Sequence, residues 1–107
     1  MAGSDAAPAR VLRIAELLFT RIITGFSNKE IADALSVSPS SVSRDLELLR
    51  RAGWAQKLDS GRWALTEKPS ALMPAYQRSM TELAARKDSF EARVTLKTQR
   101  FLEEHYG

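Results

Sequence analysis

The 107-residue chain has no cysteine and a single histidine, His105, close to its end. The lack of cysteine excludes disulfides and thiolate metal sites, and a histidine without clustered partners is a poor metal ligand or catalytic base. There is no glycine-rich phosphate loop, and the paired acids, Asp45 with Glu47 and Glu103 with Glu104, are expected on helix surfaces without partners for acid–base chemistry. We therefore expect no enzyme, no cofactor and no metal.

Long apolar runs are also missing. No stretch approaches the eighteen or so apolar residues of a membrane span, and the N-terminus MAGSDAAPAR lacks the basic-then-apolar order of a signal peptide. We expect a cytoplasmic protein with no membrane partner. The net charge of +3 permits a nucleic-acid partner without requiring one, and the absence of an acidic tail disfavours nucleic-acid mimicry.

The most informative stretch is 27–51, SNKEIADALSVSPSSVSRDLELLRR, which is typical of two short helices joined by a tight turn. Ser27 and Glu30 fit a capping box at the start of the first helix. Ser38 is a candidate N-cap of the second helix, and Pro39 suits its first position. Val37 can pack in the corner between the helices. The apolar positions expected to face inward are Ile31, Ala34, Leu35, Val42, Leu46 and Leu49.

The exposed face of the second helix is rich in serine, a mediocre helix former. Hydroxyl groups can donate to phosphates or base edges, short side chains allow close approach, and a helix N-terminus attracts negative charge. This face favours DNA binding, although the same serines could simply be capping and turn residues. Its members are Ser40, Ser41, Ser43, Arg44 and Glu47.

The flanking segments extend this pattern into a domain. A strongly apolar helix is expected from about Pro8 to Thr24, with Gly25 as its C-terminal stop, and its apolar excess could also supply a dimer contact. Behind the helix pair, residues 54–58 and 63–66 read as a β-hairpin around a turn containing glycine. The predicted fold class is mainly α with a small β-hairpin: a winged helix-turn-helix over residues 8–67, after a disordered segment at residues 1–7.

These motifs resemble the winged helix-turn-helix domain of IclR-type transcription regulators. The likeness rests on Glu30-Ile31-Ala32, on SSVSRDLELL at residues 40–49, on Gly53-Trp54 and on Trp63-Ala64-Leu65. It implies DNA binding by the winged helix. Regulators of that family also carry a large ligand-binding domain, for which the remaining forty or so residues offer no room, so we expect no small-molecule effector domain.

The rest of the chain is expected to form a linker and one long helix. Pro69 and Pro74 predict a loop at residues 68–74. From residue 75 to about residue 105, the seam positions recur at alternating spacings of four and three, which is typical of a coiled coil, with Lys87 and Lys97 at two of them. We expect this extension to form a homodimer, with a hairpin folded at residues 87–89 or a mostly solvated helix as alternatives. The dimerisation residues would be Tyr76, Met80, Leu83, Phe90, Val94 and Phe101.

The favoured function is that of a small transcription regulator that binds double-stranded DNA sequence-specifically as a dimer. Its size suggests a phage or mobile-element regulator. Base contacts are expected from Ser40, Ser41, Ser43 and Arg44, with Arg44 the best candidate for a bidentate guanine contact. Backbone contacts are expected from Asn28, Lys29, Ser38, Arg51, Lys57 and Arg62. For Arg62 a solvated hairpin tip is the alternative. The rival hypothesis is a winged-helix adaptor that binds proteins and does not touch DNA.

Overall fold

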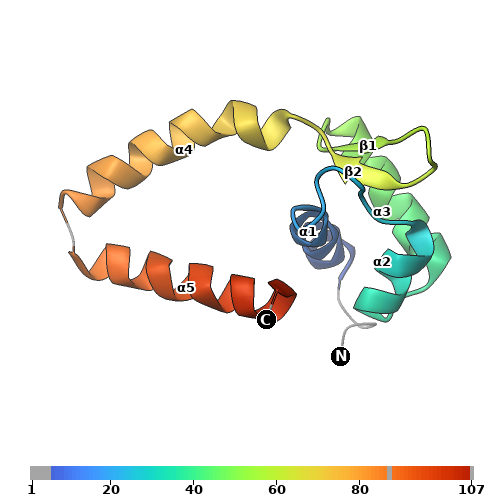
Figure 1. Cartoon of the computed structure of the whole chain (residues 1–107), viewed down its shortest axis with the longest axis horizontal. Coiled ribbons are helices and arrows are strands. Elements are labelled where there is room, and N and C mark those ends of the chain that lie inside the picture. Colours follow the sequence, from blue (N-terminus) through green and yellow to red (C-terminus); the bar gives the residue numbers. More distant parts are fainter. Residues whose placement is uncertain (1–5, 87, 107) are drawn as a thin grey trace. The chain divides into compact units, whose positions relative to one another are not determined.

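The computed structural model describes residues 6–86 and 88–106 and divides into two compact units, one ending at Pro69 and one beginning at Ser70. Helices and a short antiparallel hairpin make up the chain (Figure 1). The predicted fold class is confirmed: a winged helix-turn-helix is followed by C-terminal helical structure. The elements are α1 (Ala7–Leu18), α2 (Asn28–Leu35), α3 (Pro39–Arg51), β1 (Ala55–Lys57), β2 (Trp63–Leu65), α4 (Lys68–Ala84) and α5 (Asp88–Tyr106).

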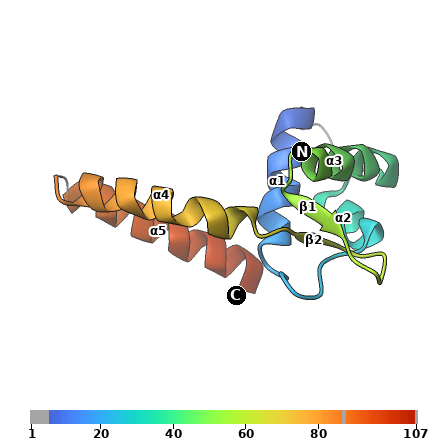
Figure 2. The same ribbon diagram turned by 90° about the horizontal axis from the view of Figure 1, so that it is seen from above.

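The first unit has one apolar core, to which all three of its helices and both strands contribute (Figure 2). Val37, predicted to fill the corner between α2 and α3, is half-buried and packs against this core. One predicted core position is wrong: Ala34 is exposed and Ala32 is buried instead. Successive helix residues are about 100° apart, so Leu35 and Ala32 lie on the same side of Ile31 around α2, whereas Ala34 lies on the opposite side. The core covers α2 on the side of Ala32. The largest fully buried aliphatic side chains of the described residues are Ile14, Leu18, Ile31, Val42 and Leu46.

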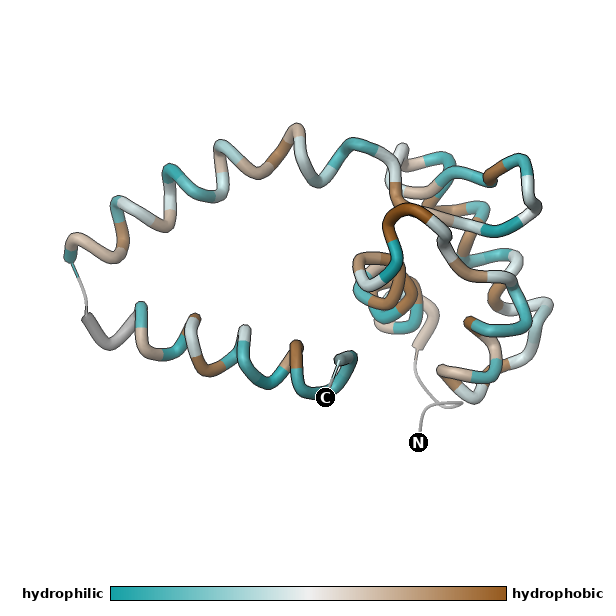
Figure 3. The backbone as a smooth tube through the Cα atoms, viewed as in Figure 1, coloured by the Kyte–Doolittle hydropathy of each residue, from teal (hydrophilic) through white to brown (hydrophobic). Residues whose placement is uncertain are grey.

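The first helix is shorter than the sequence predicts, because α1 ends at Leu18 and not at Thr24. The hydroxyl of Thr20 donates to the carbonyl oxygen of Leu17 at 2.7 Å, and the segment that follows is rich in β-branched residues, which are weak helix formers. The side chains of Ile22 and Ile23 therefore leave the helix and are 61% and 88% exposed. Figure 3 shows this loop after α1 as a hydrophobic segment of the backbone.

Gly25 has a role other than the predicted helix stop. Its φ is +68°, and an added Cβ would lie 2.2 Å from the carbonyl oxygen of Trp63, so only glycine fits there. This close approach lets Phe26 pair with Trp63 in an isolated antiparallel bridge, with N–H···O distances of 2.8 and 2.7 Å. The chain before α2 is thereby hydrogen-bonded to the hairpin.

The wing forms where it was predicted. Strands β1 and β2 pair antiparallel, with Ala55 opposite Leu65 and Lys57 opposite Trp63. Gly61 adopts a φ of +88° in the turn, with open space around it. The hairpin packs Ala55 and Leu65 into the core, which fixes the wing against the helices.

The predicted loop at residues 68–74 is wrong, because α4 begins at Lys68 and contains Pro74. Pro69 lies in the first turn, where its missing N–H has no intrahelical acceptor to lose. Pro74 removes only one i→i−4 hydrogen bond, and the helix continues on both sides of it. No residue of α4 is buried.

The single helix predicted from residue 75 to residue 105 is also wrong. It is divided between α4 and α5, and the chain reverses direction between them, as the hairpin alternative anticipated, although Lys87 itself lies outside the described residues. A depression is lined by Tyr76 from α4 and by Val94 and Phe101 from α5. Seam residues thus face one another across the reversal. Tyr76 and Leu83 are exposed, Met80, Val94 and Phe101 are half-buried, and the side chain of Phe90 lies outside the described residues. Of the segment predicted to be disordered, residues 1–7, residues 1–5 lie outside the described residues, and Ala7 is helical because it begins α1.

Candidate nucleic-acid interface

The start of α3 is held in place by its own serines. Ser38 is the N-cap, and its hydroxyl oxygen accepts a hydrogen bond from the backbone N–H of Ser41 at 3.2 Å. The same hydroxyl donates to the Ser41 hydroxyl at 3.0 Å and lies 3.2 Å from that of Ser40. Arg44 completes the cluster by donating to the Ser41 hydroxyl at 3.4 Å. Capping and presentation of a polar face are therefore combined in one group of residues.

The periodicity of α3 separates this polar face from the core. Val42 and Leu46 are fully buried, whereas Ser40, Ser43 and Arg44 are exposed. Ser41 is half-buried at the edge of the face. Three of the four predicted base-contacting side chains are thus directly accessible on one side of the helix.

Asn28, at the start of α2, connects the two helices. Its side-chain NH2 group donates to the carbonyl oxygen of Pro39 at 3.2 Å and to the hydroxyl oxygen of Ser43 at 2.8 Å. Asn28 was predicted to contact a phosphate. Its amide hydrogens are engaged by α3, so its side chain sets the position of one helix start against the other.

The predicted phosphate-binding cations Lys29 and Arg51 are both well exposed and lie in local ion pairs. Lys29 Nζ is 2.7 Å from Asp33 Oδ2, and this hydrogen bond raises the lysine pKa above its ordinary value. Arg51 Nε is 3.7 Å from Glu47 Oε1. Hydrogen bonding from Arg50, and then the charges of Arg50 and Arg51, lower the pKa of Glu47. Such exposed pairs are weak and can exchange for phosphate contacts.

Arg62, predicted to lie at the tip of the wing, is turned back onto the domain. Its guanidinium donates to the carbonyl oxygens of Thr24 and Gly25 at 3.0 and 2.9 Å and to Glu30 Oε1 at 2.6 Å. The backbone N–H of Ser27, with a further contribution from Arg62, lowers the pKa of Glu30. Arg62 therefore joins the wing to the loop before α2 and to the first turn of that helix.

Lys57 is the other predicted cation of the wing. It is exposed on β1, and its Nζ lies 5.9 Å from the centroid of the Trp63 ring, within the range of a cation–π interaction. Its ammonium group stays accessible to solvent.

The structure contains a buried ion pair on α3 that the sequence did not predict. Asp45, expected as a surface acid without a partner, is 1% exposed and forms a bidentate pair with Arg10 of α1, with Arg10 Nη2 at 3.0 Å from Asp45 Oδ1. The signal was present, because Asp45 lies three residues after Val42 and four before Leu49, on the buried stripe of the helix. The pair joins α3 to α1 at the residue that follows Arg44.

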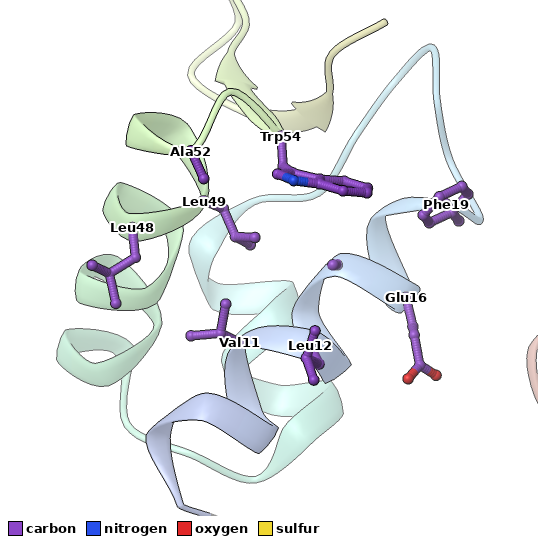
Figure 4. Close-up of a pocket in the computed structure, with 9 residues that line it drawn as sticks. Val11, Leu12, Glu16, Phe19, Leu48, Leu49, Ala52 and Trp54 are labelled. Carbon is purple, nitrogen blue, oxygen red and sulfur yellow. The ribbon is translucent and has the colours of Figure 1, made fainter. Parts of the chain in front are cut away.

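On another side of the first unit, α1 and α3 enclose an open apolar groove of about 610 Å³ (Figure 4). Leu12, Phe19 and Leu48 line it and are 65%, 39% and 51% exposed. Trp54 lies over one end, and Glu16 is the only charged residue in its lining. Part of the apolar excess predicted for the first helix therefore lines this groove.

Residues 8–60, just under half of the chain, match the family model of ECF sigma factors. The match indicates a helix-turn-helix DNA-binding domain like region 4 of sigma70. It spans α1, α2, α3 and β1 and ends before β2. A search of curated proteins and a search of solved structures found no match. The similarity supports a DNA-binding function related to transcription, and the family that the model describes is non-enzymatic.

Two further properties concern the described part of the chain. None of its helices is long and apolar enough to span a bilayer. Its histidine and carboxylate side chains form no cluster of three or more that could hold a metal ion.

Proposed function

We propose that the chain is a sequence-specific reader of double-stranded DNA that regulates transcription, with the start of α3 entering the major groove. The observation that carries this proposal is the exposed polar face formed by Ser40, Ser43 and Arg44, beside a well-capped helix start. Arg44 supplies only hydrogen-bond donors and can bind guanine O6 and N7 together. Ser40, Ser41 and Ser43 supply the remaining base contacts.

Backbone contacts in this proposal come from cations whose charge faces solvent: Lys29, Arg51 and Lys57. Ser38 adds a hydroxyl at the helix start. Asn28 and Arg62 contribute by holding α2, α3 and the wing together, since their donors are used within the protein. This division predicts that replacing Arg62 alters stability more than the salt dependence of DNA binding.

Dimerisation remains part of the proposal and rests on the second unit. From Ser70 onward, no described residue is buried, and large apolar side chains such as Leu72, Tyr76, Leu96 and Leu102 are 47%, 58%, 47% and 48% exposed. Such exposure is unusual for a monomer in water. A second copy would cover these side chains and place two copies of α3 on two half-sites.

The finer family assignment is also a proposal. The wing, whose second strand lies beyond residue 60, supports the resemblance to IclR-type regulators. We also propose a phage or mobile-element regulator as its biological setting.

A protein-binding adaptor is the second candidate, and the apolar groove between α1 and α3 favours it. An adaptor needs an accessible apolar surface and has no need for Arg44 on the exposed face of α3. The two candidates therefore differ in their dependence on Arg44.

The test begins with selection of bound duplexes from a random pool, using the full chain. Arg44→Ala is then titrated against the selected duplex by fluorescence anisotropy. We expect a loss of about 1–3 kcal/mol of binding free energy and a relaxed base preference at one position. Arg78→Ala is the matched control, because Arg78 is an exposed helical arginine of α4 whose side chain is 85% exposed. Equal binding by Arg44→Ala and the parent would refute the assignment of α3.

A further inference from the structure

The hydrogen bond between Asn28 and Ser43 leaves the hydrogen of the Ser43 hydroxyl free for a contact with DNA. The amide group of Asn28 lies against two acceptors at once, the carbonyl oxygen of Pro39 and the hydroxyl oxygen of Ser43. A carbonyl oxygen can only accept, so the Asn28 atom at 3.2 Å from it must be the NH2 nitrogen. The orientation of the amide is thereby fixed by chemistry.

The consequence for Ser43 follows from the same nitrogen. An amide NH2 has no lone pair available to accept, so the Ser43 hydroxyl must be the acceptor in the 2.8 Å contact. Its own hydrogen is then not used by Asn28. No other hydrogen bond from the Ser43 side chain is found in the described part of the chain, and Ser43 is exposed on the reading face. The Ser43 O–H is therefore available to donate outward, and one lone pair of the oxygen remains beside it.

Arg44, the next residue, can also only donate. Ser43 and Arg44 together present donors on one face of α3. In the major groove guanine shows two acceptors, N7 and O6, whereas the exocyclic amines of adenine and cytosine are donors. A donor facing a donor leaves both groups unpaired, which costs affinity.

We propose that Asn28 is a positioning residue that keeps the Ser43 hydrogen available to donate, so that Ser43 and Arg44 can both bind acceptor-bearing base edges, guanine first. This inference rests on the proposed function, since it assumes that α3 reads the major groove. It adds the class of base selected and a residue on α2 that controls the selection without touching the base.

The test uses Asn28→Asp in the full chain. The aspartate carboxylate has the shape of the amide but has no hydrogen to donate, so the Ser43 hydroxyl must donate to it and offers only lone pairs to DNA. The parent is expected to prefer an acceptor-bearing edge at the base read by Ser43 by about three- to tenfold. In Asn28→Asp we expect this preference to disappear or to move to adenine or cytosine, while the preference at the base read by Arg44 is kept.

Ser43→Ala, made in the parent and in Asn28→Asp, identifies the base position that Ser43 reads. In the parent it removes the base preference at that position. Without the Ser43 hydroxyl, Asn28→Asp is expected to change no base preference. The added negative charge weakens binding to every sequence, so the readout is the ratio between competing duplexes in the same selection. Asn28→Ala is the second variant if Asn28→Asp unfolds in a thermal melt. It frees the Ser43 hydroxyl to rotate, and the preference is expected to fall below about twofold.

The outcomes separate the two proposals. If the parent enriches a sequence and Arg44→Ala relaxes it, while folded Asn28→Asp or Asn28→Ala keeps the parent's preference at every position, the inference about Asn28 is overturned and the proposed function stands. If the parent enriches no duplex, both are overturned. A change confined to the base read by Ser43 supports the inference, because a general loss of structure would weaken all positions alike.

Discussion

The buried pair between Arg10 and Asp45 yields the sharpest prediction for stability. Asp45→Ala removes one partner of a guanidinium, that of Arg10, whose side chain is only 14% exposed. Breaking a buried ion pair from one side commonly costs about 3–5 kcal/mol, because it leaves an uncompensated charge inside. Arg10 keeps partial contact with solvent, so we expect Asp45→Ala to lower the free energy of unfolding by about 2–4 kcal/mol.

This loss is large for a winged domain of some sixty residues, whose total stability is on the order of 5 kcal/mol. Urea denaturation followed by circular dichroism measures it, with Asp33→Ala as the control. Asp33 is also a helical acid in an ion pair, but its side chain is 66% exposed, so its removal is expected to cost less than about 1 kcal/mol.

A double replacement tests the mechanism. Arg10→Met with Asp45→Leu removes both charges and fills the space with apolar groups, which is often neutral or stabilising. We expect the double variant to regain most of the stability lost in Asp45→Ala. The reasoning is refuted if Asp45→Ala unfolds at the same urea concentration as Asp33→Ala, since a pair that matters to the core cannot be removed without loss.

Two smaller predictions concern the ends of α2. Ser36 has a left-handed φ of +56°, so Ser36→Gly is expected to raise the free energy of unfolding by about 0.5–1 kcal/mol, and a lower urea midpoint would contradict it. The pKa of Glu30 is lowered by the N–H of Ser27, so ionised Glu30 stabilises the fold above its ordinary pKa of 4.5, and this contribution is lost as the pH falls through the folded-state pKa. Glu30→Gln should therefore be less stable than the parent at pH 7, by a difference that shrinks as the pH falls below 4.5, and a difference that does not change with pH would rule this out.

The helix-turn-helix could be predicted because its signals are local. Ser27 and Glu30 form the capping box that their spacing predicts, and Ser38 caps α3 as expected. These contacts join residues three apart, so the sequence alone contains both partners. The wing was predictable for the same reason, since the turn with Gly61 lies between two short apolar segments.

The errors arose where distant residues decide the outcome. Gly25 looked like a helix stop, but its conformation serves a close approach to Trp63, thirty-eight residues later in the chain. Arg62 looked like a free wing-tip cation, but carbonyl oxygens of the loop after α1 bind it. Asp45 needed Arg10, thirty-five residues away, to be recognised as a core residue. Spacing along the chain cannot reveal such partners.

The central claim, that α3 binds duplex DNA, is tested most directly by titrating the full chain with random-sequence duplex at several salt concentrations. We predict binding at 50 mM salt that weakens steadily toward 200 mM, with a dissociation constant on the order of 10⁻⁴–10⁻⁶ M for nonspecific duplex. Absence of binding at 50 mM salt by a folded chain would contradict the account and leave the adaptor as its replacement.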